Sequence, residues 1–189
     1  MRHTSHIRVD LDAVAGNLRA IRADLGPGTR LCSVVKADAY GLGARRLTRT
    51  LVGAGSDRLA VFTPAQAAEI EEVSGAAPIM VLMPVRELPR DPAISRLLAA
   101  GRLELTVGSL EQLTALTEIR LGRPLPVHVE VDCGMGRGGV DPRALATLVE
   151  GVRLSRSLRL RGMSTHFSSA DPETIAVQAT RFDLSLIHI

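Results

Sequence analysis

Lys36 and Tyr40 are the first residues along the chain whose types and spacing could support chemistry. Lys36 directly follows the apolar run 31–35, and Tyr40, the only tyrosine, comes shortly after it in a glycine-containing segment. If the run is a strand of a parallel sheet, Lys36 lies at its carboxyl end, where parallel α/β folds place their active sites. A partly desolvated lysine there can form a Schiff base with a carbonyl compound, and a nearby phenol can hydrogen-bond a phosphate. Position alone also fits a surface lysine and a tyrosine packed on the rim.

Arg137 lies in a second cluster, the segment 130–139, in which four glycines surround a single arginine. Glycines allow positive φ angles and a close approach of the backbone to a ligand. The guanidinium offers a fixed fork of donors to a carboxylate or a phenolate oxygen. The spacing differs from the GxGxxG nucleotide fingerprint, and no Walker lysine follows. The alternative is a flexible turn with a solvated arginine, but the glycine density after a predicted strand favours a functional loop.

His166 belongs to a third cluster, residues 164–171, which closes the last apolar run of the chain. A lone histidine is more often structural than catalytic. Here it shares a predicted sheet edge with Lys36 and Arg137, and the carboxyl edge of a parallel sheet is where ligands bind. We therefore treat His166 as a third candidate site residue.

A repeated pattern of a short apolar run followed by an amphipathic helix positions these clusters. An opening helix is predicted over residues 12–25, because apolar residues recur at helical spacing and Gly26-Pro27 ends it. Strands alternating with helices indicate an α/β fold with a parallel sheet. The six predicted strands are 31–35, 59–62, 79–82, 103–107, 127–131 and 158–164.

The intervening helices carry their own start signals. A capping side chain precedes a proline at several of them, and proline suits the first turn because its missing N–H would be unpaired there. Those caps are Thr63, Asp91, Asp141 and Asp171. Ser109 and Gln112 have the spacing of a capping box. A (β/α)8 TIM barrel needs eight units and typically about 250 residues. Six units predict either an open doubly wound sheet or a TIM barrel truncated after about six βα units.

The composition is that of an ordinary globular protein, with 46% hydrophobic and 23% charged residues. The net charge of +3 is small and the arginines are scattered, so we expect no nucleic-acid partner. The first nine residues lack an apolar run and a cleavage site, and no stretch is long enough to span a membrane. We therefore expect no membrane association and a cytoplasmic location. Cys32 and Cys133 are expected to be buried free thiols, and no metal site is predicted.

Together, these clusters resemble the alanine racemases of the fold-type III pyridoxal-phosphate class. The segment 34–41 (VVKADAYG) resembles the cofactor-lysine signature of that family, which is highly specific. Residues 133–137 (CGMGR) resemble its Gly-Met-Gly-Arg loop, residues 165–171 its later histidine motif, and residues 10–18 its opening. The similarity runs from about residue 7 to residue 182 and implies a TIM barrel rather than an open sheet.

The resemblance implies a role for each of these side chains. Lys36 would carry pyridoxal 5'-phosphate and act as the base on one face of the substrate α-carbon. Tyr40 would contact the cofactor phosphate, Arg137 would bond its phenolic oxygen and help place the substrate carboxylate, and His166 would sit against the ring. The implied activity is the interconversion of L-alanine and D-alanine by a homodimer, which supplies D-alanine for the bacterial cell wall.

Two positions depart from the family pattern. Leu42 stands where the family commonly has a histidine, which looks tolerable. Glu130 stands where many members have a lysine that can become carbamylated and then pairs with the loop arginine. A carbamate is an anion, so Glu130 could supply that charge directly and hold Arg137 by charge-assisted hydrogen bonds. The alternative for Glu130 is a solvent-facing strand residue.

The chain is shorter than the family pattern. In that family the opposite-face base is a tyrosine of a C-terminal β domain, contributed across a dimer interface, and the arginine facing the pyridine nitrogen also lies further along. We therefore expect residues 1–183 to be a partial cofactor-binding barrel, inactive alone, whose C-terminal β domain is missing. Residues 184–189 read like an in-frame translation of a sequencing-library adapter, so we expect a non-native tail. A divergent native tail is the alternative.

Two other functions stay open. Single-domain barrels that bind pyridoxal phosphate without a β domain act in cofactor homeostasis, but they lack the Ala-Asp-Ala-Tyr-Gly run after the lysine. A related amino-acid racemase or a D-amino-acid lyase would share the barrel. Sequence beyond residue 189 would distinguish these functions. A tyrosine base there indicates a racemase, and a metal-binding His/Cys pair indicates a lyase.

Overall fold

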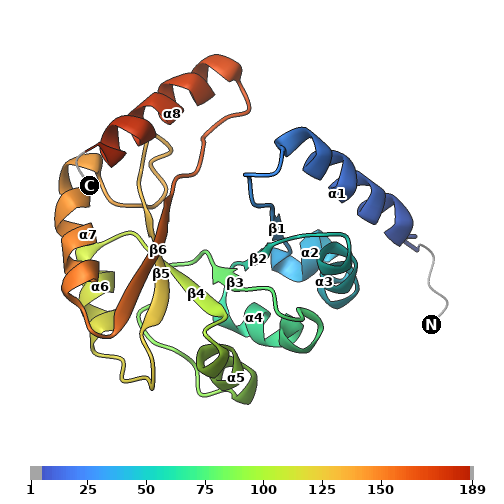
Figure 1. The fold of residues 1–189 in the computed structure, drawn as a ribbon, viewed down its shortest axis with the longest axis horizontal. Coiled ribbons are helices and arrows are strands. Elements are labelled where there is room, and N and C mark those ends of the chain that lie inside the picture. Colours follow the sequence, from blue (N-terminus) through green and yellow to red (C-terminus); the bar gives the residue numbers. More distant parts are fainter. Residues whose placement is uncertain (1–5, 188–189) are drawn as a thin grey trace.

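The computed structural model describes residues 6–187, which form one curved parallel sheet with helices along its outer side (Figure 1). The strands lie side by side in chain order, and every neighbouring pair is parallel. They are β1 (Cys32–Val34), β2 (Arg58–Val61), β3 (Ile79–Val81), β4 (Leu103–Val107), β5 (Leu125–Glu130) and β6 (Leu158–Ser164). The predicted α/β fold and all six predicted strands are confirmed, with ends that differ from the predicted ones by no more than two residues.

The helices fill the connections between the strands. They are α1 (Leu11–Leu25), α2 (Lys36–Gly41), α3 (Ala44–Gly53), α4 (Pro64–Ile70), α5 (Pro92–Ala100), α6 (Leu110–Thr117), α7 (Leu145–Leu154) and α8 (Pro172–Leu186). The predicted caps form, because the side chains of Thr63, Asp91, Ser109 and Asp171 accept bonds from backbone N–H groups at the helix starts. Asp141 caps the short 3-10 turn Pro142–Ala144 that leads into α7.

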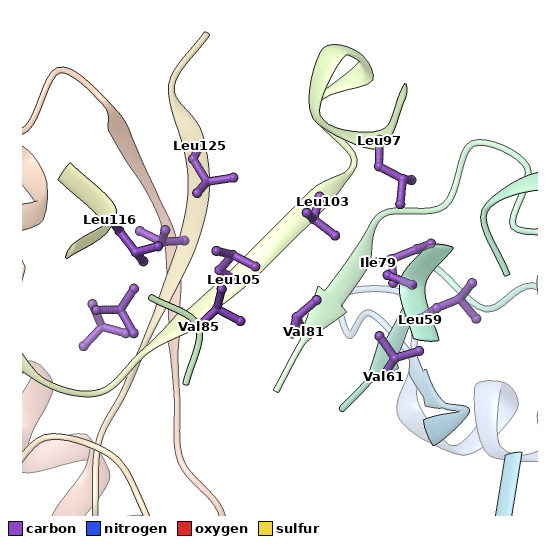
Figure 2. Packing of buried hydrophobic residues seen from close by; sticks show 14 of the residues in the cluster. Leu59, Val61, Ile79, Val81, Val85, Leu97, Leu103, Leu105, Leu116 and Leu125 are labelled. Carbon is purple, nitrogen blue, oxygen red and sulfur yellow. The ribbon is translucent and has the colours of Figure 1, made fainter. Parts of the chain in front are cut away.

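The hydrophobic core lies between the sheet and the outer helices. Alternate strand residues point outward, and in β2, β3 and β4 these are buried leucine, isoleucine and valine. Figure 2 shows Leu97 of α5 against Ile79 and Leu103 of the neighbouring strands. These apolar residues recur at every second position, because successive side chains of a strand point to opposite faces of the sheet.

The opposite, inward face of the sheet carries polar groups at its centre. Glu104 of β4 is 1% exposed and accepts contacts from three basic side chains. The Nε of Arg58 lies 2.9 Å from it, the Nε2 of His128 2.8 Å, and the Nε of Arg161 3.7 Å. A Cβ at Gly162 would lie 3.4 Å from Nδ1 of His128, so the glycine leaves room for that ring. The inner face therefore holds an ion cluster across β2, β4, β5 and β6.

Two strands of the sheet have a single neighbour within residues 6–187: β1 pairs only with β2, and β6 only with β5. In Figure 1 the helices α1 and α8 flank the opening between these two edges. The strand order β1 to β6 with helices on the outside is that of a barrel wall, as predicted. Within the described residues β1 does not pair with β6, so these six strands do not close a barrel. In the same part of the chain, no helix has the length and apolarity needed to cross a membrane.

One sequence prediction about the cysteines was wrong. Cys133 is buried, but Cys32 is exposed. Cys32 lies on β1, which has a neighbour on one side only in the described residues. The prediction failed because an apolar strand was assumed to be covered on both faces.

Candidate active site

Lys36 follows the end of β1, at the carboxyl edge of the sheet. The Val35 N–H donates to the Ala60 carbonyl at 2.8 Å, which continues the β1–β2 pairing to the residue before the lysine. Val35 is buried and Lys36 is half-buried. The lysine therefore has a fixed backbone and a side chain with access to the edge, as the sequence predicted. Lys36 is also the only lysine in the whole sequence.

The segment after Lys36 is a left-handed turn, which the sequence gave no reason to expect. Residues 37–40, none of them glycine, have φ values of 51°, 52°, 52° and 57°. Left-handed backbone costs roughly 1–2 kcal/mol for each such residue, so other contacts must hold the turn. Asp38 provides two of them: its carbonyl accepts from Gly43 N–H at 2.9 Å, and its Oδ1 accepts from Ala44 N–H at 2.7 Å.

This strained turn presents Tyr40 to solvent while burying its neighbour Ala39. Tyr40 is 65% exposed, so its phenol is available to a ligand at the sheet edge. Backbone held in sparsely populated regions clusters at functional sites. This exposure does not fit the alternative of a tyrosine packed on the rim, and the contact of Tyr40 with a phosphate stays a prediction.

The loop that carries Arg137 is folded around the carboxylate of Asp132. Its Oδ1 accepts from the N–H groups of Gly134 at 2.9 Å and Gly136 at 3.0 Å. These backbone bonds hold the pKa of Asp132 below its ordinary value. Gly139 has a φ of 97°, and a Cβ there would lie 2.7 Å from the Asp132 nitrogen, so only glycine fits. The loop is thus ordered backbone rather than a flexible turn, whereas Arg137 itself is exposed, and its binding role stays a prediction.

Glu130 ends β5 and is half-buried beneath this loop. Burial raises the pKa of its carboxyl, the charge of Arg137 lowers it, and Asp132 adds to the rise, with a net increase. Arg137 is therefore close enough to act on Glu130 electrostatically. Within the described residues, however, no ion pair of 4.0 Å or less joins the two. The predicted direct hydrogen bonds stay a prediction, whereas the solvent-facing alternative does not fit a half-buried carboxyl.

His166 lies just past the carboxyl end of β6. Burial lowers the pKa of its imidazole, and the charges of Arg137 and Lys36 lower it further. Because the strands are parallel, the side chains that follow β1, β5 and β6 lie at the same carboxyl edge of the sheet. At neutral pH the lowered pKa keeps His166 uncharged, so it can accept or donate a hydrogen bond without adding a third positive charge.

Several residues that shape the site were missed at the level of sequence. Asp38 and Asp132 fold the two loops, and Gln178 of α8 touches the segment after His166. For Asp132 a signal existed, since aspartate two residues before a glycine commonly bonds the turn backbone. In the described part of the chain, no group of three His, Cys, Asp or Glu side chains is arranged to hold a metal.

The chain has the architecture of a parallel α/β barrel protein. A lysine follows its first strand, and an arginine and a histidine follow its fifth and sixth strands at the same edge of the sheet. The chain belongs to the alanine racemase family, because the family model for the N-terminal domain of alanine racemase matches residues 9–188.

Individual relatives agree with this assignment. The alanine racemase of Synechocystis sp. is 36% identical over 178 residues, which cover 93% of this chain and 47% of that protein. The alanine racemase of Geobacillus stearothermophilus is 37% identical over 180 residues, covering 92% of this chain and 45% of its own.

Solved structures give the same result. The alanine racemase from E. faecalis matches with a TM-score of 0.82 at 31% identity, covering 96% of this chain and 49% of that one. The Bacillus anthracis alanine racemase, solved with bound L-Ala-P, also has a TM-score of 0.82, at 26% identity over 95% of this chain and 47% of its own. The chain thus spans about half the length of the alanine racemases it matches.

Proposed function

We propose that this chain is the cofactor-carrying N-terminal barrel of a pyridoxal-phosphate-dependent racemase that interconverts L-alanine and D-alanine. The observation that carries the proposal is that Lys36, Arg137 and His166 follow the carboxyl ends of β1, β5 and β6, so all three lie at one edge of the parallel sheet. Support comes from the names of the relatives, all alanine racemases, and from the L-Ala-P bound to the Bacillus anthracis enzyme.

The donor set of the site fits pyridoxal 5'-phosphate. That molecule carries an aldehyde, a phosphate and a phenolic oxygen, and the site offers a primary amine, an exposed phenol and a guanidinium fork. Lys36 would hold the aldehyde carbon, Tyr40 would bond the phosphate, and Arg137 would bond the phenolic oxygen. The neutral imidazole of His166 would sit against the ring. When bound, the cofactor supplies an electron sink for the α-carbon of the substrate.

The chain's own groups then account for half of a racemisation. Lys36 takes the α-proton from one face of the substrate and returns it there, since its amine is the base at this edge. Arg137 helps to place the substrate carboxylate through its charge and its hydrogen-bond donors. Glu130 holds the guanidinium of Arg137 by its charge. A second base on the opposite face is needed to invert the centre, and no residue described here supplies it.

We also propose which parts of the complete protein finish the site, and where the protein works. Residues 1–183 form a partial barrel, and a C-terminal β domain of a homodimer completes the site with the second base. We also propose that residues 184–189 are a non-native tail; against this, the family match runs to residue 188 and α8 continues to Leu186. The product D-alanine is used in the bacterial cell wall, and the protein works in the cytoplasm without membrane or nucleic-acid partners.

The test is racemisation by the completed protein. The flanking gene sequence is recovered, the full reading frame is expressed with pyridoxal phosphate, and D-alanine formed from L-alanine is measured by chiral chromatography. Lys36→Ala removes the amine and should lower the rate by about 10²–10⁴-fold, the usual loss for a missing general base. Cofactor binding without racemisation would favour a homeostasis protein, and turnover of a larger D-amino acid would favour a related racemase or lyase. An unimpaired Lys36→Ala variant would refute the proposal.

A further inference from the structure

Gln178 of α8 is a buried amide that no catalytic step above uses. It is 4% exposed, and both ends of its amide bond the same residue. Its Oε1 accepts from the Ser168 N–H at 2.9 Å, and its Nε2 donates to the Ser168 hydroxyl at 2.8 Å. Ser168 lies two residues beyond His166. The amide therefore fixes both the backbone and the side chain of the segment that follows the histidine.

The same amide also packs against the loop of Arg137. A Cβ at Gly134 would lie 3.1 Å from Nε2 of Gln178 and 3.0 Å from a guanidinium nitrogen of Arg181. Gly134 has a φ of 130°, and Arg181 donates to the Cys133 carbonyl at 3.4 Å. One face of α8 thus meets the Arg137 loop and the His166 segment at once. Pocket-lining groups around this junction include Gly134, Ser168 and Gln178.

The two loops have only sparse direct links of their own. Beyond the β5–β6 pairing, the Val131 N–H donates to the Ser164 carbonyl at 2.8 Å, and the Thr165 hydroxyl donates to the Val131 carbonyl at 2.8 Å. Both bonds lie on the strand side, before Arg137 and His166 along their loops. Beyond His166, Gln178 bonds Ser168 twice, and the same amide lies against Gly134, which precedes Arg137 in its loop.

We propose that Gln178 is a positioning residue, which sets the spacing of His166 relative to Arg137 by holding Ser168 and Gly134 on α8. A misplacement of about 1 Å at a reacting centre can cost about a hundredfold in rate, so a group that fixes two site loops affects turnover without touching substrate. The inference rests on the proposed function for its effect on catalysis, but not for its geometry.

Three variants of the completed protein separate the contribution of each Gln178 hydrogen bond from that of the rest of α8. Gln178→Met keeps the length of the side chain and removes both hydrogen bonds. Ser168→Ala removes only the bond to the hydroxyl, because the backbone N–H stays. Thr180→Ala is the matched control on the exposed side of the same helix, where it removes only a bond to the Ala176 carbonyl.

The first readout is the titration of His166 by NMR in the cofactor-free protein. Burial and the charges of Arg137 and Lys36 lower the pKa of this imidazole, so a change in its position relative to Arg137 should move the midpoint. Gln178→Met should shift the midpoint, Ser168→Ala should shift it less, and Thr180→Ala should leave it unchanged. This readout stands even if the protein proves not to be a racemase.

The second readout is steady-state racemisation. Gln178→Met should lower kcat about tenfold or more, and Thr180→Ala should keep the wild-type kcat. The assay temperature stays below the Tm of each variant, so that unfolding does not lower the rate. The inference is overturned if Gln178→Met leaves both the His166 midpoint and kcat unchanged, or if it lowers only Tm. A shifted midpoint in a protein that racemises nothing would keep the positioning role and refute the proposed function alone.

Discussion

At the scale of single residues, Lys36 is the most informative position in the chain. All the other strongly basic side chains in the sequence are arginines. Arginine stays protonated in proteins and cannot act as a nucleophilic amine, whereas lysine can. The lone lysine at the carboxyl end of the first strand therefore supplies a nucleophilic amine that an arginine there could not supply. An amine-directed label can therefore react with only one side chain of this sequence, that of Lys36.

Glu130 offers a test in which stability and activity move in opposite directions. Burial raises the pKa of this carboxyl in the folded protein. A raised carboxyl pKa favours the protonated form, so it stabilises the fold at low pH and costs stability once the pH rises through the folded value. Glu130→Gln removes the costly charge. We expect a higher Tm at neutral pH and a several-fold lower racemisation rate, because Arg137 loses its anion.

The control for this prediction is Glu72→Gln. Glu72 is fully exposed, and the hydrogen bond and charge of Arg45 hold its pKa below the ordinary value. Its removal should leave racemisation unchanged and should not raise Tm. Added bicarbonate should not rescue Glu130→Gln, since no carbamate is involved. Unchanged kinetics in Glu130→Gln would contradict the electrostatic role that we propose.

At the scale of elements, Glu104 connects four strands on the inner face of the sheet. Burial raises the pKa of its carboxyl, but the hydrogen bond from His128 and the charge of Arg58 outweigh this, so the net pKa is lowered. A lowered carboxyl pKa stabilises the fold above the unfolded value of about 4.5, and this contribution is lost as the pH falls through the folded value.

Glu104→Gln should therefore destabilise the completed protein by about 3 kcal/mol at neutral pH, since it leaves Arg58 without its buried partner. The loss should shrink as the pH falls below about 4.5. Urea titrations across that range measure it, with Glu150→Gln on the exposed face of α7 as the control. A loss that is the same at every pH would show that the cluster contributes through packing rather than through charge.

The elements were largely predictable from sequence, and the site only in part. Apolar runs and proline-preceded caps such as Thr63 and Asp91 gave the strands and the helix starts, because these depend on local patterns. The left-handed turn at residues 37–40 was not predictable, since alanine and tyrosine do not favour positive φ and tertiary contacts through Asp38 hold them there. Gln178 was missed because its partners, Ser168 and Gly134, are distant along the chain.

At the scale of the whole molecule, the two outer strands decide how residues 1–189 should behave alone. Each of β1 and β6 has one neighbour in the described residues, and the edge strand β1 exposes Val34. Unpaired backbone groups and apolar side chains at such edges promote aggregation. We expect this segment, expressed alone, to be aggregated or to lack a cooperative thermal transition, and to racemise nothing.

Size-exclusion chromatography and calorimetry of residues 1–189 beside the completed protein measure this difference. The completed protein should elute as a dimer and melt cooperatively. A monomeric, cooperatively melting segment with racemase activity would contradict the view that the barrel wall needs further strands and a second base.

We propose above all that Lys36 holds the cofactor, and peptide mapping of the reduced adduct can identify the labelled residue. The completed protein is loaded with pyridoxal phosphate, reduced with borohydride and digested with trypsin. Because the modified lysine resists cleavage, the label should appear on the single peptide 31–45, which ends at Arg45. Lys36→Ala should carry no label in the same digest. A label on a lysine elsewhere in the completed protein, or none at all, would contradict the claim.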